Sequence, residues 1–131
     1  MKILISGATG FLGGALLAEF ARRGQADRLL MQVRAPDQDA GLARIRAVMG
    51  TFEVPQAHID ALTPSQILCG DLEAPEAMLA DARLDDVTHV VNSAALATFS
   101  NNPKLWPINV EGTFAFAKRM AAVKTLQRFV H

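Results

Sequence analysis

Three evenly spaced glycines, Gly7, Gly10 and Gly13, follow a short apolar run near the N-terminus, in the segment ISGATGFLGGALL. The first can make a tight turn out of a strand, the second lets backbone approach a ligand, and the third lets a helix pack closely on a sheet. The N-terminus of that helix offers unpaired N–H groups and a partial positive charge, and both favour a phosphate. The spacing is a variant of the general dinucleotide fingerprint, whose first two glycines stand one residue closer. A glycine-rich turn that binds no ligand is the alternative.

An arginine stands where an NAD site usually has an acidic residue, about twenty residues beyond the glycines. Arg34 ends the second apolar run, and its guanidinium suits the 2′-phosphate of NADP(H), which it can bind with two N–H groups and a full charge. Arg44, on the next predicted helix, is a second candidate contact, although a solvated helix face is the simpler interpretation for it. Asp37 and Asp39 also follow the strand, and either could accept a hydrogen bond from a ribose hydroxyl, so NAD(H) stays an alternative.

Strand-like and helix-like segments alternate along the whole chain. The strands are predicted at 2–6, 28–34, 66–69, 87–92 and from 128 onward. The helices are predicted at 11–23, 37–50, 75–83 and 105–123, with an irregular connection at 51–65. This alternation favours an α/β fold of the Rossmann type, a doubly wound parallel sheet of strand order 3-2-1-4-5 with helices on both faces. The glycine turn then lies at the carboxyl end of the first strand, where open α/β sheets bind ligands.

Apolar periodicity predicts which helix faces meet the sheet. The predicted buried faces are Leu12, Ala15, Leu16 and Phe20 in the first helix, and Phe114, Ala117 and Ala121 in the last. Asp37 is expected to cap the second helix, while Gly24 and Gly50 are expected to end the first and second helices.

The composition is typical of one soluble globular domain, with 131 residues of which 50% are hydrophobic and 20% charged. Lys plus Arg equals Asp plus Glu at 13 each, so no charge excess indicates a nucleic-acid or anionic-membrane partner. No apolar run approaches the ~20 residues of a membrane span. The single cysteine, Cys69, excludes an internal disulfide and fits a reducing cytoplasm, and it is expected to be a small buried hydrophobe. No cluster of His and Cys has metal-ligand spacing.

Five segments resemble, in order, the motifs of the extended short-chain dehydrogenase/reductase superfamily: GATGFLG at 7–13, GDL at 70–72, NSAA at 92–95, NVEGT at 109–113 and RFVH at 128–131. The resemblance implies a nicotinamide nucleotide with Asp71 on the adenine amino group, Leu72 against the adenine ring, and small residues at the nicotinamide end. Asn109 is expected to hydrogen-bond the backbone of a neighbouring strand. A turn-forming aspartate is the simpler interpretation of Asp71. The expected cofactor-binding residues are Gly7, Thr9, Gly10, Phe11, Leu12, Gly13, Arg34, Arg44, Asp71, Leu72, Ser93, Ala94 and Ala95.

Within that superfamily, the segments 33–49 and 92–99 look most like the acyl-thioester reductases. These include the fatty-acyl, male-sterility-type reductases and the terminal reductase domains of carboxylate reductases and peptide synthetases. The resemblance implies NADP(H)-dependent reduction of a carbonyl or an acyl-thioester. A nucleotide-sugar epimerase or dehydratase, which shares the other motifs, is one alternative, and a non-catalytic NADP(H)-sensing module is another.

Members of this superfamily use a tyrosine, assisted by a lysine, as the proton donor, and this sequence has no tyrosine. The last predicted strand also begins only at Arg128. We therefore expect residues 1–131 to be the N-terminal part of a longer enzyme, able to bind cofactor but not to catalyse. Exposed apolar surface is expected to favour self-association.

Overall fold

Five parallel strands form one sheet in the computed structural model, which describes residues 1–131. The strands are β1 (Ile3–Ser6), β2 (Leu29–Val33), β3 (Ile67–Cys69), β4 (His89–Asn92) and β5 (Arg128–Val130). They are arranged in the order β3-β2-β1-β4-β5, and every neighbouring pair is parallel. In this register Leu4 of β1 lies between Leu30 of β2 and Val90 of β4. The predicted doubly wound, Rossmann-type fold and its strand order are confirmed.

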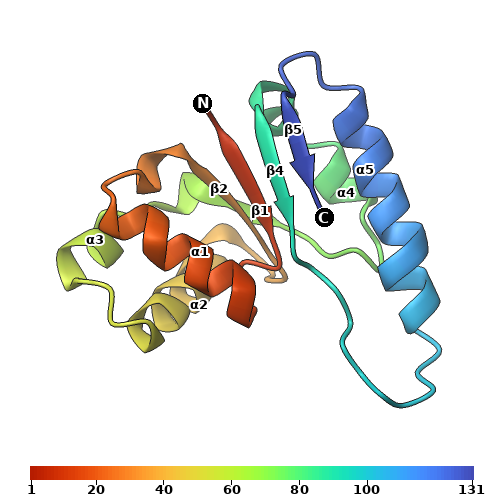
Figure 1. Cartoon of the computed structure of the whole chain (residues 1–131), viewed down its shortest axis with the longest axis horizontal. Coiled ribbons are helices and arrows are strands. Elements are labelled where there is room, and N and C mark those ends of the chain that lie inside the picture. The colour runs from red at the N-terminus through yellow and green to blue at the C-terminus, as the bar shows by residue number, and fades with distance from the viewer.

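Helices cover the two faces of the sheet unequally, as Figure 1 shows. One layer contains α1 (Phe11–Arg22), α2 (Gln38–Thr51) and α3 (Gln56–Asp60), and the other contains α4 (Glu76–Leu79) and α5 (Thr113–Ala121). Successive strand residues point to opposite faces, so Ile3 and Ile5 join the core under α1 and α2, while Leu4 joins the core under α5. Both faces of β1 and β2 are therefore buried.

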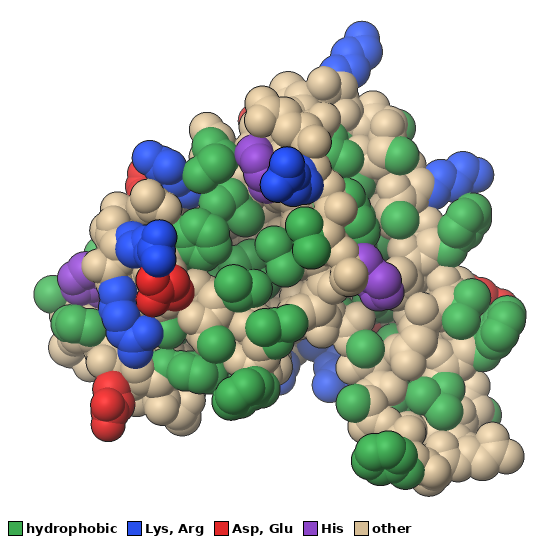
Figure 2. All heavy atoms as spheres, in the orientation of Figure 1, with side chains coloured by type: hydrophobic (Ala, Val, Ile, Leu, Met, Phe, Trp, Pro, Cys, Tyr) green, Lys and Arg blue, Asp and Glu red, His purple; other side chains and the backbone are tan.

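The sheet is less covered at β4 and β5, because the core under α1 and α2 takes no side chain from either strand. Arg128 and Val130 of β5 are exposed, and only Phe129 packs against the core under α5. Figure 2 shows apolar side chains on the face where β1, β4 and β5 are visible in Figure 1. None of the helices combines the length and apolar content that a membrane span requires.

The buried faces of α1 and α5 differ from those predicted. Leu12 of α1 is 58% exposed. The buried residues of α1 are instead two glycines, two alanines and one leucine, namely Gly13, Gly14, Ala18, Ala21 and Leu17. A Cβ added to Gly13 would lie 2.2 Å from the Gly7 carbonyl oxygen, so the helix approaches the glycine turn too closely for larger side chains. In α5 the buried residues are Phe116 and Met120, and Phe114 is 68% exposed.

Several predicted boundaries also change. The connection predicted as irregular contains α3, which begins after Pro55, a residue whose fixed φ favours a helix start. The predicted helix at 75–83 is divided into α4 and a 3₁₀ segment, Ala82–Asp86. The predicted helix at 105–123 is a π-helical turn, Pro107–Gly112, followed by α5. Gly50 lies inside α2, which continues to Thr51.

Two predicted helix ends are confirmed. The side chain of Asp37 accepts a hydrogen bond from the Ala40 N–H at 2.8 Å and so caps α2. Gly24, with φ of +66°, follows the end of α1 in the left-handed conformation that glycine adopts without steric cost.

Candidate functional site

A cleft of about 250 Å³ opens at the carboxyl edge of the sheet. Figure 2 shows the molecule hollowed at this edge, between the layer of α1 and α2 and the part that contains α5. The strand order reverses direction at β1, and ligands of doubly wound sheets bind beside such a reversal. The lining residues are Gly7, Thr9, Gly10, Gln32, Arg34, Asp71, Leu72, Glu73, Ser93, Ala94, Ala95, Leu96 and Ile108.

The backbone around the glycine turn leaves no room for a side chain at Gly7. Gly7 has φ of +67°, and a Cβ added to it would lie 2.7 Å from the Ala94 backbone nitrogen. Gly10 donates its N–H to the Gly7 carbonyl oxygen at 2.9 Å and is the N-cap residue of α1. No side chain caps this helix, so the N–H groups of its first turn can bind an anion.

Three of the six residues predicted in this turn do not line the cleft. Phe11 is 85% exposed, and its ring lies 6.1 Å from that of Phe52, between the centroids. Leu12 also faces solvent. Gly13 is buried beneath the turn, where it lets α1 pack against Gly7. The side chains of Phe11 and Leu12 therefore lie outside the cleft, while their backbone N–H groups belong to the uncapped first turn of α1, so their contact with a cofactor stays a prediction. Gly13 supports the turn from behind.

The two candidate arginines take different positions. Arg34 lines the cleft from the end of β2, and its guanidinium takes part in no ion pair or hydrogen bond within the chain. Arg44 lies outside the cleft lining, and its Nη1 donates to the carbonyl oxygen of Arg34. Arg44 thus supports the backbone at the end of β2, while the Arg34 guanidinium is free to bind an anion.

Asp71 lines the cleft and also forms the turn after β3. Its Oδ1 accepts hydrogen bonds from the N–H groups of Glu73 at 2.8 Å and Ala74 at 3.0 Å. Asp71 therefore forms the turn and also lines the cleft, and its contact with adenine stays a prediction. Leu72 contributes to the lining but is buried in the core under α5. Glu73 forms an ion pair with Lys104 at 2.9 Å, which joins this turn to the loop after β4.

The small residues after β4 form the opposite wall. Ser93 donates its hydroxyl to the carbonyl oxygen of Ser6 at 2.8 Å, so its side chain is directed toward β1. Asn109 accepts from the Leu96 N–H at 2.7 Å and donates to the Leu96 carbonyl at 3.0 Å. The predicted backbone contact of Asn109 is thus found, on the loop that leaves β4. It holds Ala94 and the residues after it against the cleft.

Four lining residues were not predicted: Gln32, Glu73, Leu96 and Ile108. Gln32 was signalled by its polarity within the otherwise apolar run LLMQV, whereas Leu96 and Ile108 have no sequence feature that separates them from core residues.

Cys69, the last residue of β3, lies next to the Gly70–Leu72 turn, is half-buried and packs against the core under α1 and α2. Burial raises the pKa of the Cys69 thiol, Asp37 raises it further and Arg83 opposes both, so the group stays a neutral thiol.

A family of NAD-binding domains described as "Male sterility protein" matches residues 5–131. The L-2-aminoadipate reductase large subunit of Penicillium chrysogenum is 30% identical over an alignment of 132 positions, which covers 95% of this chain and 9% of that protein. An isonitrile lipopeptide synthase of Streptomyces coeruleorubidus is 33% identical over an alignment of 131 positions, which again covers 95% of this chain and 9% of that protein. The chain spans between 2% and 11% of the length of the curated relatives it matches.

Two solved reductase domains have the same architecture. The terminal R domain of the myxalamid PKS-NRPS pathway matches with a TM-score of 0.78 and 25% identity, over 98% of this chain and 34% of that chain. The reductase domain of a non-ribosomal peptide synthetase from Mycobacterium tuberculosis matches with a TM-score of 0.70 and 29% identity, over 98% of this chain and 32% of that chain. The chain therefore belongs to the male sterility protein family, an NAD(P)-binding branch of the extended short-chain dehydrogenase/reductase superfamily that includes thioester reductases.

Proposed function

We propose that this chain is the NADP(H)-binding part of an oxidoreductase that reduces a carbonyl or an acyl-thioester. The observation that carries the proposal is the meeting, in one cleft, of the uncapped N-terminus of α1 with the unpaired guanidinium of Arg34. The first provides N–H groups for a pyrophosphate and the second a charge for a 2′-phosphate. The similarity to reductase domains of peptide synthetases supports the acyl-thioester as substrate class.

Each wall of the cleft has a role in this proposal. Gly7, Thr9 and Gly10 hold the pyrophosphate, and Gly13 keeps the turn in place. Asp71 and Leu72 receive the adenine. The residues Ser93, Ala94 and Ala95 leave room for the nicotinamide and its ribose, because they are small. When bound, the nicotinamide supplies or accepts a hydride.

The proton donor for carbonyl reduction is the part that this sequence lacks. The superfamily uses a tyrosine, and none of the 131 residues is one. General acid catalysis contributes typically about 10²–10⁴-fold, so we propose that this chain binds nucleotide without turnover. The same observation favours a non-catalytic NADP(H)-sensing module as the second candidate.

Because its one cysteine is a neutral free thiol, we further propose a reducing, cytoplasmic location.

The test is a calorimetric titration of NADPH into the purified chain and two glycine variants. Aspartate at Gly10 is a good N-cap for α1, so Gly10→Asp should fold, but its charge would face the pyrophosphate. We expect NADPH affinity to fall at least tenfold in Gly10→Asp. We expect no change in Gly50→Asp, the matched control, because no atom lies within 4 Å of a Cβ added at Gly50.

The same three proteins are then assayed with NADPH and a panel of aldehydes and acyl-thioesters. We expect saturable binding by the wild-type chain and no turnover. A wild-type chain that is folded by circular dichroism but binds no NADPH would contradict the proposed function. Turnover that disappears in Gly10→Asp would show that this chain contains its own proton donor.

A further inference from the structure

Gln32 is a buried amide that lines the cleft, near the carboxyl end of the otherwise apolar strand β2. Its side chain is 6% exposed, and the chain has only two other buried polar residues, Ser6 and Asn92. Because β2 lies between β1 and β3, a side chain at this position can reach the turns that follow both neighbours.

The amide of Gln32 bonds to both of those turns at once. Its Oε1 accepts from the Gly7 N–H at 3.2 Å, and its Nε2 donates to the Gly70 carbonyl oxygen. These two glycines have φ of +67° and +147°, so each is the residue at which its turn changes direction. An amide has both an acceptor and a donor, which this pair of contacts requires, and a carboxylate has only acceptors.

We propose that Gln32 is a positioning residue that holds the glycine turn and the Gly70–Leu72 turn at one separation, so that the cleft is preformed for the two ends of a dinucleotide. The inference rests on the proposed function. Preformed geometry raises affinity because less ordering is required on binding. The Gly7 N–H is already bonded to Gln32, so the pyrophosphate is left to the other N–H groups of the turn and of the first turn of α1.

This role predicts an effect that does not distinguish the two nicotinamide nucleotides. Both contacts of Gln32 go to backbone that surrounds the part shared by NADPH and NADH. In Gln32→Met, which keeps the length of the side chain but loses both hydrogen bonds, we expect both nucleotides to bind about tenfold more weakly. Gln127→Met, the same change at an exposed residue before β5, is the matched control and should bind as the wild-type chain does.

The pH dependence of nucleotide affinity in Gln32→Glu is a measurement that a simple loss of packing would not change. At neutral pH its carboxylate cannot donate to the Gly70 carbonyl and would repel the pyrophosphate. A protonated carboxyl has one donor and one acceptor, so it can restore both contacts, and burial raises its pKa. We therefore expect the affinity for NADH, relative to that of the wild-type chain, to recover as the pH is lowered from 8 to 5.5. NADH is the probe because it lacks the 2′-phosphate, whose own titration near pH 6 would confuse the comparison.

Amide hydrogen exchange in the unliganded proteins gives a measurement that is independent of nucleotide binding. The Gly7 N–H should exchange faster in Gln32→Met than in the wild-type chain, while the Leu4 N–H in the centre of β1 keeps its protection. If Gln32→Met does not fold, the pH series of Gln32→Glu decides the question. Equal affinities of the wild-type chain and Gln32→Met, or no recovery of Gln32→Glu at low pH, would overturn the inference. A wild-type chain that binds neither nucleotide would instead overturn the proposed function.

Discussion

Arg34 and Arg44 stand ten residues apart and have different environments. Arg44 has its guanidinium bound to a backbone carbonyl, whereas Arg34 lines the cleft and its guanidinium has no partner in the chain. A cation that has no partner in the chain keeps its full capacity for an anionic ligand. We therefore attribute the proposed preference for NADP(H) over NAD(H) to the side chain of Arg34.

At the residue scale we predict that Arg34→Ala weakens NADPH binding by about 1.5–3 kcal/mol, the usual contribution of hydrogen bonds to a charged group. NADH should be little affected, because it has no 2′-phosphate. Arg28→Ala is the matched control, since it removes the same charge just before the opposite end of β2. Calorimetric titration with both nucleotides measures the difference. An equal loss for NADPH and NADH would show that Arg34 has another role.

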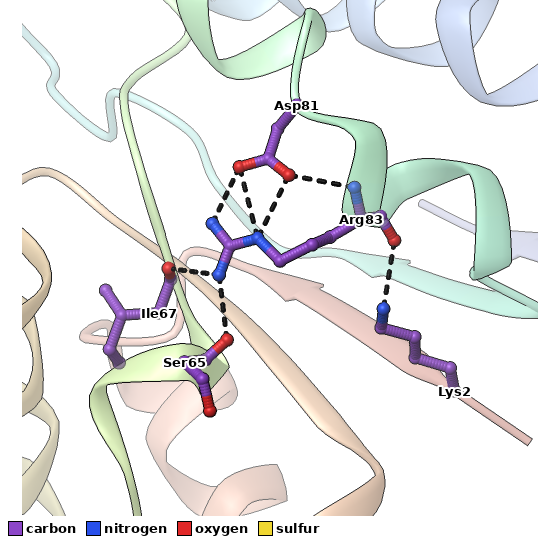
Figure 3. A network of polar contacts seen from close by, with 5 residues as sticks. All are labelled: Lys2, Ser65, Ile67, Asp81 and Arg83. Carbon is purple, nitrogen blue, oxygen red and sulfur yellow. Dashed lines mark hydrogen bonds and ion pairs between the residues drawn. The ribbon is translucent and has the colours of Figure 1, made fainter.

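At the element scale, Arg83 joins three segments of the chain, as Figure 3 shows. These contacts lie at the amino ends of β1 and β3, opposite the cleft at the carboxyl ends. Arg83 donates to the carbonyl oxygens of Ser65 at 2.7 Å and Ile67 at 3.0 Å, at the start of β3. Its Nη2 also pairs with the Asp81 carboxylate at 2.7 Å, and its own carbonyl accepts from Lys2 Nζ at 3.1 Å. The short edge strand β3, which leads into the Gly70–Leu72 turn, is thereby held at its first residues.

We predict that Arg83→Ala lowers the free energy of unfolding by about 1–3 kcal/mol, because the carbonyls of Ser65 and Ile67 and the carboxylate of Asp81 lose the guanidinium as donor. The side-chain hydrogen bond from Arg83 lowers the pKa of Asp81, and the charge and backbone N–H of Arg83 contribute in the same direction. The ion pair therefore stabilises the folded state at pH values above 3.8, the ordinary pKa of an aspartate. This stabilisation is lost as the pH falls through the lowered pKa of Asp81.

Urea unfolding at pH 7 and at successively lower pH measures both effects. The difference between the wild-type chain and Arg83→Ala should narrow as the pH falls from 3.8 through the lowered pKa of Asp81, since the carboxylate is protonated first in the unfolded state and then in the folded state, where the ion pair disappears. Arg83→Lys should recover only part of the stability, because one ammonium group cannot reach both carbonyls and the carboxylate in the fork geometry of a guanidinium. A difference that stays constant with pH would contradict the assigned role of the ion pair.

At the scale of the whole molecule, we propose that exposed apolar surface leads to self-association. Trp106, Val110 and Phe114 recur at intervals of four residues and are all exposed. We predict that sedimentation velocity shows a mass that rises with concentration and that Phe114→Glu reduces this rise. Phe99→Glu, the same change at an exposed loop residue, is the control. A mass that stays constant with concentration, or an equal effect of both variants, would contradict association through the surface formed by Trp106, Val110 and Phe114.

The sequence by itself determined the order of strands and helices, the parallel sheet and the place of the glycine turn. These features follow from local signals, namely apolar runs, a polar cap at Asp37, and glycines at positions such as Gly24 that require positive φ. Alternating strands and helices, joined by right-handed crossovers, leave few arrangements open.

Only the tertiary structure decided which faces of α1 and α5 are buried and which polar groups meet. The helix α5 has apolar side chains on two sides, and contact with the sheet selects Phe116 over Phe114. The role of Gln32 depends on Gly7 and Gly70, which are 25 and 38 residues away along the chain. The periodicity of a sequence shows only that a helix face is apolar, not which of two apolar faces meets the sheet. Gln32, Gly7 and Gly70 come within hydrogen-bonding distance because the strands pack side by side in the sheet, and no local sequence pattern encodes that packing.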